Sequence, residues 1–300
     1  MLPDSPFSSK AAGTTGAAFL KLALPARSEA LGGAAAAGAD NSDALFINPA
    51  GLLTLGPETP SDLSFSYNSL LESSYLSYAA YAKALGKSSA LAAGFVYFSQ
   101  GAMTAYNGQG DPAGTFRPSD LAVSAAYARR FDEFSLGGGL KMIRASVDDV
   151  SGTTAALDFG GQARNVCLVG ERPLDVGASL TNFGPAIKLG GASAPLPLAL
   201  AAGMLWHASP ALDSSLDVHL PVDQDPYVSL GVEAFLFFDQ SRRKAAFRVG
   251  YDQSHGRDID GLTGMTAGMG LDLGAFRLDY AWVPLGDLGM QNRITLAFRF

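Results

Sequence analysis

The sequence predicts an all-β protein, a 14-stranded antiparallel transmembrane β-barrel that follows an N-terminal plug segment. Three observations predict this fold. From about residue 62 onward, segments of roughly ten residues alternate between apolar and polar side chains. The connections between these segments are short at one end and mostly long at the other. Finally, 48% of the 300 residues are hydrophobic and only 16% are charged, yet no apolar run reaches the ~18–20 residues of a membrane-spanning helix.

The alternation predicts each strand in turn. In the last segment residues 294, 296, 298 and 300 are apolar, whereas Arg293, Thr295 and Arg299 lie between them. Side chains that alternate in this way point to opposite faces of a sheet. The same pattern predicts strands at 62–69, 75–85, 88–98, 120–131, 134–145, 153–163, 173–182, 196–207, 213–220, 227–238, 244–252, 262–273, 275–283 and 291–300.

The connections carry independent information about the two rims of the barrel. The connection after the sixth strand, Arg164–Arg172, is predicted to be longer than the others on its rim. On the opposite rim the connections are mostly longer and rich in Gly, Asp, Asn and Pro, and the largest spans 99–119. Short turns at one rim and long loops at the other are typical of outer-membrane barrels. The tight connections are expected at Gly86–Lys87, Asp132–Glu133, Ser209–Pro210, Asp239–Arg243 and Gly274.

The two faces of the strands indicate which side meets lipid. The apolar faces carry Leu, Val, Phe and Met, with aromatic residues such as Trp206 and Trp282 near strand ends. The opposite faces combine Gly with ionisable residues of both signs, which the packed core of two soluble β domains would not tolerate but a polar or plugged lumen would. These charges either tie the plug to the wall through charge-assisted hydrogen bonds or line a pathway. The candidate lumen charges are Arg248, Arg277, Asp279, Arg293 and Arg299.

Residues 1–60 lack the alternation and form a separate unit ahead of the barrel, which comprises residues 61–300. A barrel of this size has a lumen wider than its own side chains fill. Small residues, abundant in this segment, suit a chain that packs against strand backbones. We therefore expect residues 1–60 to form a plug, or hatch, inside or under the barrel.

Local signals predict short turns within this plug. The Ala-rich stretch 28–38 predicts a short helix, which Gly32 and Gly33 weaken. The cluster Asp40-Asn41-Ser42 predicts a helix cap. Pro49 ends the turn that follows, because a proline restricts the residue before it, Asn48, to extended geometry.

An ordered set of motifs extends along nearly the whole chain, at 19–22, 25–27, 32–34, 43–52, 174–185, 196–198, 276–288 and the terminal ITLAFRF. Together these motifs resemble the PorV/PorQ family, which belongs with the FadL-type outer-membrane barrels. The resemblance implies a 14-stranded barrel with an N-terminal plug that carries the motif Asn48, Pro49, Ala50 and Gly51. It also implies a docking role in a type IX-like protein secretion system. The run Ala34–Ala37 departs from the family, where bulkier residues are expected.

Several classes of chemistry are excluded or unsupported. A net charge of −7 provides no basic field for nucleic acid. The single cysteine, Cys167, excludes a disulfide framework, and the three histidines have no metal-ligand spacing. Gly86-Lys87-Ser88 lacks the glycine that a phosphate loop requires five positions earlier. The sequence therefore predicts a non-enzymatic protein with no catalytic residue, cofactor or metal.

Two functions follow from the remaining features. In the first, the barrel is a docking or shuttle component for secretion, and Tyr106, Phe116 and Arg117 of the 99–119 loop contact secretion proteins or exported cargo. In the second, it is a FadL-like passive conduit for long-chain fatty acids or other hydrophobic small molecules. The conduit would need an apolar pocket between plug and wall, and its candidate lining residues could equally form the plug core. These residues are Leu45, Phe46, Ile47, Leu52, Leu53 and Leu55.

Both functions place the protein in the outer membrane of a Gram-negative-type bacterium, in contact with outer-membrane lipid. Phe298 and Phe300 of the closing segment resemble the C-terminal signal that the barrel assembly machinery recognises. Residues 1–10 are polar and lack the apolar core of a signal peptide, so we interpret the chain as a mature or trimmed form.

Overall fold

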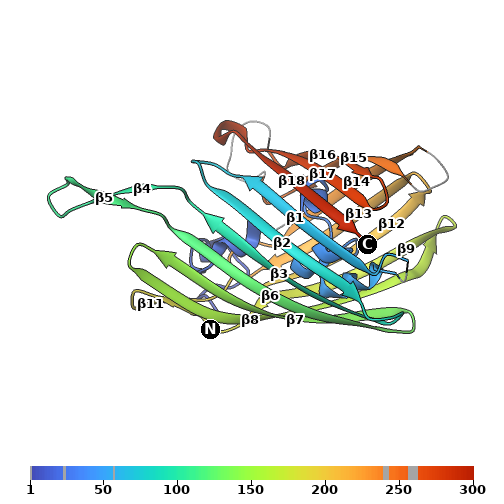
Figure 1. The fold of residues 1–300 in the computed structure, drawn as a ribbon, viewed down its shortest axis with the longest axis horizontal. Helices are drawn as coiled ribbons and strands as arrows, with labels where there is room; N and C mark the ends of the chain where they lie inside the picture. Colours follow the sequence, from blue (N-terminus) through green and yellow to red (C-terminus); the bar gives the residue numbers. More distant parts are fainter. Residues whose placement is uncertain (1, 23–24, 57, 239–242, 256–262) are drawn as a thin grey trace.

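A computed structural model describes residues 2–22, 25–56, 58–238, 243–255 and 263–300. The described strands form a closed antiparallel barrel in the order β1-β18-β17-β16-β15-β14-β13-β12-β9-β8-β7-β6-β3-β2, which confirms the 14-stranded barrel that the sequence predicts (Figure 1). The barrel strands are β1 (Ser61–Ser69), β2 (Tyr75–Ala84), β3 (Ser89–Ser99), β6 (Ser119–Phe131), β7 (Phe134–Val147), β8 (Val150–Val169), β9 (Arg172–Phe183), β12 (Ala199–Ser209), β13 (Leu212–Pro221), β14 (Tyr227–Phe237), β15 (Lys244–Asp252), β16 (Met265–Asp272), β17 (Phe276–Pro284) and β18 (Met290–Arg299).

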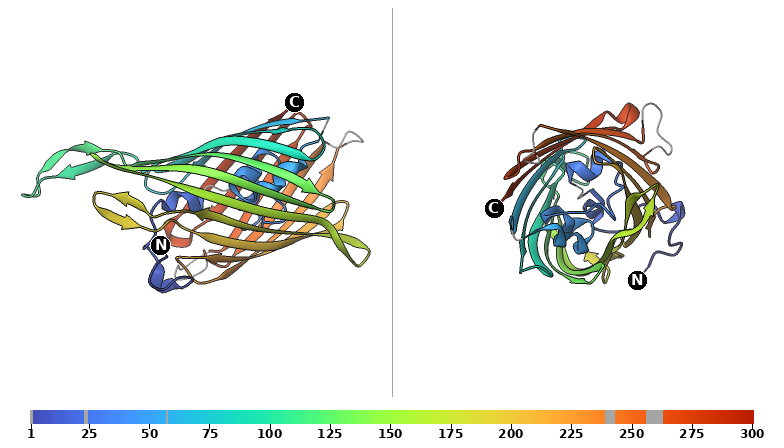
Figure 2. Two further views of the ribbon diagram at one scale, coloured as in Figure 1. Left: turned by 90° about the horizontal axis from the view of Figure 1, so that it is seen from below. Right: turned by 90° about the vertical axis from the view of Figure 1, so that its right-hand side faces the viewer.

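Two small hairpins extend from the long loops. The hairpin of β4 (Met103–Tyr106) and β5 (Pro112–Phe116) projects well beyond the barrel, as Figures 1 and 2 show. The hairpin of β10 (Ile187–Leu189) and β11 (Ala192–Ala194) lies at the same rim. A short 3-10 turn, η5 (Gly286–Leu288), joins β17 to β18 there.

The rims differ from the prediction at two connections. The segment Arg164–Arg172 is not a long loop, because β8 continues to Val169 and a tight turn at Gly170 and Glu171 leads into β9. A register shift between Ala163 and Cys167 interrupts the alternation there, so the period no longer indicates a strand. At the opposite rim β7 and β8 are joined by a tight turn at Asp148. Most of the expected turn at Asp239–Arg243 and the first residue of the expected strand 262–273 lie outside the described residues.

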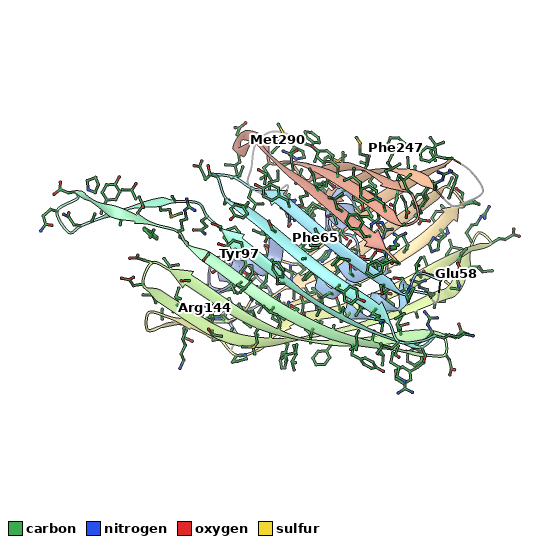
Figure 3. All side chains as sticks on the ribbon, in the orientation of Figure 1. Glu58, Phe65, Tyr97, Arg144, Phe247 and Met290 are labelled. Carbon is green, nitrogen blue, oxygen red and sulfur yellow. The ribbon has the colours of Figure 1, made fainter. Side chains whose placement is uncertain are left out.

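The outer wall is apolar. Side chains such as Phe65 and Phe247 point away from the barrel (Figure 3) and are 44% and 56% exposed. Aromatic pairs lie toward both ends of the strands: the rings of Tyr67 and Tyr75 are 5.9 Å apart near the long-loop rim, and those of Tyr81 and Phe300 are 6.5 Å apart near the other. Such an exterior suits a hydrocarbon phase flanked by two interfaces.

No helix in the described part of the chain is long and apolar enough to cross a membrane.

The N-terminal segment enters from the long-loop rim, and residues 26–55 lie inside the ring of strands (Figure 2, right). Near that rim, Gly16 N–H donates to Pro195 O over 2.8 Å. The short helix expected within 28–38 is confirmed only for residues 28–30: α1 ends at Ala30, because Gly32 and Gly33 have positive φ angles of 66° and 84°. The helical elements of the segment are η1 (Ser9–Ala11), η2 (Ala18–Leu22), α1 (Ala26–Ala30), η3 (Ser42–Phe46) and η4 (Pro49–Thr54).

The apolar core inside the barrel lies between η3, η4 and the adjoining wall. Leu45 and Leu52 are buried there against small residues of β2, β3 and β6, including Ala80, Ala90 and Ala126. Alanine at these inward positions leaves room for the segment, so the lumen is filled by chain rather than by long wall side chains.

Candidate functional site: the interface between the N-terminal segment and the wall

Asn48 lies at the junction of η3 and η4 and is fully buried. Its φ and ψ angles of −151° and 101° are extended, as Pro49 predicts. The side-chain amide lies 2.7 Å from Ala36 O, 3.1 Å from Gly161 O and 3.3 Å from Ala178 O. Its Oδ1 accepts from Ala50 N over 3.2 Å. One amide thus joins two parts of the N-terminal segment to β8 and β9.

Inward-facing glycines allow the segment to reach the wall. A Cβ atom on Gly160 would lie 1.9 Å from Asn48 Oδ1, and one on Gly137 would lie 2.4 Å from Pro49 C. A Cβ atom on Gly177 would lie 2.2 Å from Ala36 O. No side chain fits at these distances. These glycines could be recognised in the sequence, since they occupy inward positions of predicted strands. The sequence did not show which part of the N-terminal segment they contact.

Buried ion pairs connect the segment to β14, β15 and β17. Arg277 Nη2 lies 2.5 Å from Asp43 Oδ2, and its Nε lies 3.1 Å from Asp279 Oδ2. Arg248 bridges the wall residues Glu233 and Asp279 at 2.7 Å each. The guanidinium of Arg27 from α1 lies 2.7 Å from Glu233. The network therefore extends continuously from α1 through the wall and back to η3.

Two further arginines that the sequence places in the lumen differ in their partners. Arg293 Nη1 donates to Leu22 O over 2.7 Å, and Nη2 lies 3.3 Å from Glu29 of α1. Arg299 lies 3.0 Å from Asp272 and 3.6 Å from Asp62, which both belong to the wall. Arg277 and Arg293 thus contact the N-terminal segment directly, whereas Arg248 and Arg299 pair with wall carboxylates.

The two carboxyl groups of the segment that face Arg277 differ in electrostatic setting. Burial raises the pKa of Asp40, but attraction by Arg27 and Arg277 outweighs burial and holds that pKa well below its usual range. Burial dominates at Asp43 and raises its pKa to about 6, against the opposing effect of Arg277. The hydroxyl of Tyr78 donates to Asp43 Oδ1 over 2.9 Å. Asp43 therefore depends on Arg277 and Tyr78 for its stabilisation.

A cavity of about 340 Å³ lies between the segment and the wall toward the long-loop end. Phe46 and Ile47 line it, as do Leu20 of η2 and Ala201 of β12. The sequence did not indicate Leu20 or Ala201, although Ala201 lies on the inward face of its strand.

Four of the candidate pocket residues do not line this cavity. Leu45, Leu52, Leu53 and Leu55 are buried in the core against β2, β3 and β6. The tight turns of η3 and η4 place these leucines on the side of the segment that faces away from the cavity. The Asn48–Gly51 motif packs against β7 and β8 and does not line the cavity either.

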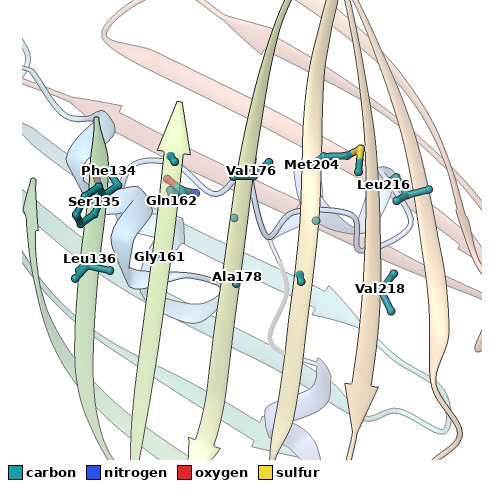
Figure 4. Close-up of a pocket in the computed structure, with 14 residues that line it drawn as sticks. Phe134, Ser135, Leu136, Gly161, Gln162, Val176, Ala178, Met204, Leu216 and Val218 are labelled. Carbon is teal, nitrogen blue, oxygen red and sulfur yellow. The ribbon is translucent and has the colours of Figure 1, made fainter. Parts of the chain in front are cut away.

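A second hollow, of about 560 Å³, lies on the outer face of the wall (Figure 4). Outward side chains of Leu136, Met204 and Val218 surround it, and Gly161 and Ala178 contribute small residues to its floor. In a membrane this face meets lipid, so the hollow is separate from the lumen cavity.

The candidate partner-binding residues lie on or beside the projecting hairpin. Tyr106 on β4 is 66% exposed, Phe116 ends β5, and Arg117 follows it. The hairpin pairs with itself and extends past the barrel (Figure 2). No contact in the structure tests a partner, so the docking role of these residues stays a prediction.

Deleting residues 104–115 is expected to leave the barrel folded, because β4 and β5 contribute no pairing to the barrel sheet. The measurement is the shift in gel mobility between boiled and unboiled samples. Loss of the heat-dependent shift would show instead that the hairpin is needed for folding.

Phe298 and Phe300 lie on the outer face and are 42% and 63% exposed. Phe300 and Ser61 exchange backbone hydrogen bonds of 3.0 Å, which close the barrel at the short-turn rim. Recognition of this end by the assembly machinery stays a prediction.

In the described residues no group of three or more His, Cys, Asp or Glu side chains is arranged to hold a metal ion.

No protein-family model matches the chain, and no curated protein sequence matches it. Solved structures do match. The toluene transporter TodX of Pseudomonas putida is 11% identical over 91% of this chain and 96% of its own, with a TM-score of 0.60. The toluene transporter TbuX of Ralstonia pickettii is 15% identical over 92% of this chain and 98% of its own, with a TM-score of 0.60. A FadL homologue of Pseudomonas aeruginosa is 11% identical over 92% of this chain and 98% of its own, with a TM-score of 0.54.

These likenesses show a shared fold. They support the FadL-type part of the resemblance seen in the sequence, and they do not confirm membership of the PorV/PorQ family.

Proposed function

We propose that the chain forms a non-enzymatic outer-membrane channel that takes up a hydrophobic small molecule from its long-loop side. The observation that carries this proposal is the cavity of about 340 Å³ between the N-terminal segment and the wall. Small-molecule sites have volumes of about 300–1,000 Å³ and are lined mainly by apolar side chains with a few polar groups. The volume lies in that range. Leu20, Phe46 and Ile47 line an apolar part of the cavity together with Ala199 and Ala201, and polar and charged side chains make up the rest of the lining.

The apolar exterior supports the membrane location. Outward side chains on the wall are mostly Leu, Val, Phe and Met, and the lumen side carries the buried charges. A closed barrel satisfies its strand hydrogen bonds internally, as a bilayer requires. The matched solved structures, two of them described as toluene transporters, support transport rather than catalysis.

The packing of the lumen between the cavity and the short-turn rim indicates that a path through the barrel is gated. Between the cavity and that rim, the segment is held by Asn48 and by the ion pairs of Arg27 and Arg277. The cavity found among these charges has only about 70 Å³. Passage to the short-turn side therefore requires the N-terminal segment to shift, and the segment acts as the gate.

Docking in protein secretion is the second candidate. The projecting β4–β5 hairpin with exposed Tyr106 favours it, because binding residues concentrate on loops held by rigid scaffolds. A docking protein needs no cavity of this size, however, so we rank it behind the channel.

Filling the cavity tests the channel. Ala201→Phe is expected to reduce entry of a hydrophobic compound through the outer membrane roughly tenfold, because the ring occupies the space that the ligand needs. The measurement is the uptake rate in cells of a Gram-negative host that carry the barrel. Ala202→Phe is the matched control, since Ala202 is the next residue and faces outward. Equal uptake by the two variants would contradict the channel.

A further inference from the structure

We infer that the lumen cavity accepts uncharged molecules and excludes carboxylates, so that the cargo is a neutral hydrophobic compound rather than a fatty acid anion. This inference rests on the proposed channel function and concerns the same cavity. It follows from the charges that line the cavity and from the partners that they already have.

The cationic side chains in the described lining are both paired. Lys21 Nζ lies 2.8 Å from Asp223 Oδ2. Arg293 Nη2 lies 3.3 Å from Glu29 Oε1, and Nη1 donates to the carbonyl of Leu22. Lys21 and Arg293, the cations that a carboxylate ligand would need, are therefore already paired with Asp223 and Glu29 of the protein.

Carboxylates outnumber cations in the same described lining. Glu29, Asp217 and Asp252 contribute to it, against Lys21 and Arg293. Asp217 is 1% exposed, and its Oδ2 accepts from Ala35 N and Ala36 N at 2.8 and 2.7 Å. Its Oδ1 is buried against Gly203 of β12, where a Cβ atom would lie 1.7 Å from it. The described lining thus carries more carboxylates than lysine and arginine side chains.

A carboxylate in this cavity would be desolvated next to like charges and without a free cation, which disfavours its binding. A neutral amide or hydroxyl group avoids this repulsion. The apolar body of the ligand would pack against Phe46 and Ile47. Charge therefore sets the specificity of the cavity, and its apolar side sets the affinity.

A pair of ligands equal in size separates charge from shape. His219 and His255 also line the cavity. We would titrate the purified barrel in mild detergent with 4-methylbenzamide and with 4-methylbenzoate at pH 8, where a free imidazole is uncharged. The amide is expected to bind at least about tenfold more tightly than the carboxylate. Carboxylate binding that equals or exceeds amide binding would overturn the inference and leave the channel standing. Failure of both ligands to bind would contradict the channel itself.

A charge-removing variant tests the cause. Asp252→Asn keeps the side-chain oxygen that accepts from Ser254 N over 2.7 Å and removes one negative charge from the lining. The ratio of the carboxylate and amide dissociation constants is expected to fall severalfold in this variant. Asp111→Asn, the same change on the exposed hairpin, is the control and should leave the preference unchanged. An unchanged preference in Asp252→Asn would show that the lining charges do not select the ligand.

Discussion

Arg277→Gln is expected to lower the stability of the folded barrel by about 3 kcal/mol, the cost of leaving buried carboxylates without their partner. Arg277 lies between Asp43 of the N-terminal segment and Asp279 of β17, and all three side chains are almost fully buried. Glutamine keeps part of the length and some hydrogen-bonding capacity but removes the charge. Asp43 would then retain only Tyr78 among the partners described above.

The measurement for Arg277→Gln is the urea concentration at half unfolding, followed by the heat-dependent gel shift and by tryptophan fluorescence. Arg144→Gln makes the same chemical change at an exposed position on the outer surface (Figure 3) and should alter stability by less than about 0.5 kcal/mol. If both variants unfold at the same urea concentration, the ion network does not hold the segment to the wall.

Gly160→Leu is expected to displace the N-terminal segment without opening the barrel. A Cβ atom at Gly160 already overlaps Asn48 Oδ1 and approaches Pro49 Cδ to 2.9 Å, so a leucine cannot coexist with the Asn48 contacts. The strand hydrogen bonds of β8 do not involve this side chain, so the heat-dependent gel shift should remain. The segment itself should become accessible.

Limited proteolysis measures that accessibility. Cleavage within residues 31–55 should become roughly tenfold faster in Gly160→Leu, as expected if local opening becomes about 1.4 kcal/mol easier. Gly161→Leu is the matched control, because a Cβ atom there meets nothing closer than Leu136 Cδ2 at 3.6 Å on the outer side. Equal protection of the segment in the two variants would contradict the close packing against β8.

Much of the barrel could be predicted because each strand is a local pattern. The alternation at residues 293–300 is sufficient to predict β18 and its two faces. Where the backbone departs from the regular pleat, the alternation is lost. The register shift between Ala163 and Cys167 is the reason that the last residues of β8 could not be predicted as strand. A register shift depends on the pairing with the neighbouring strand, and the residue pattern within one strand carries no information about that pairing.

The candidate site was harder to predict because it depends on how the N-terminal segment threads the lumen. Phe46 and Ile47 line the cavity whereas Leu45 does not, although all three are apolar and adjacent. In a 3-10 turn neighbouring residues point in different directions, and composition cannot decide which of them faces a cavity. Asp40 and Asp43, the partners of Arg277 in the N-terminal segment, are likewise separated from it by more than 200 positions in the sequence.

The central claim is that the barrel carries a hydrophobic small molecule in its lumen, and native mass spectrometry tests it most directly. The protein would be purified in mild detergent from its own membranes, and the released small molecules identified by extraction. We expect one small, uncharged apolar molecule per barrel, lost in Ala201→Phe and kept in Ala202→Phe. An empty barrel that co-purifies with other proteins would contradict the channel and support docking instead.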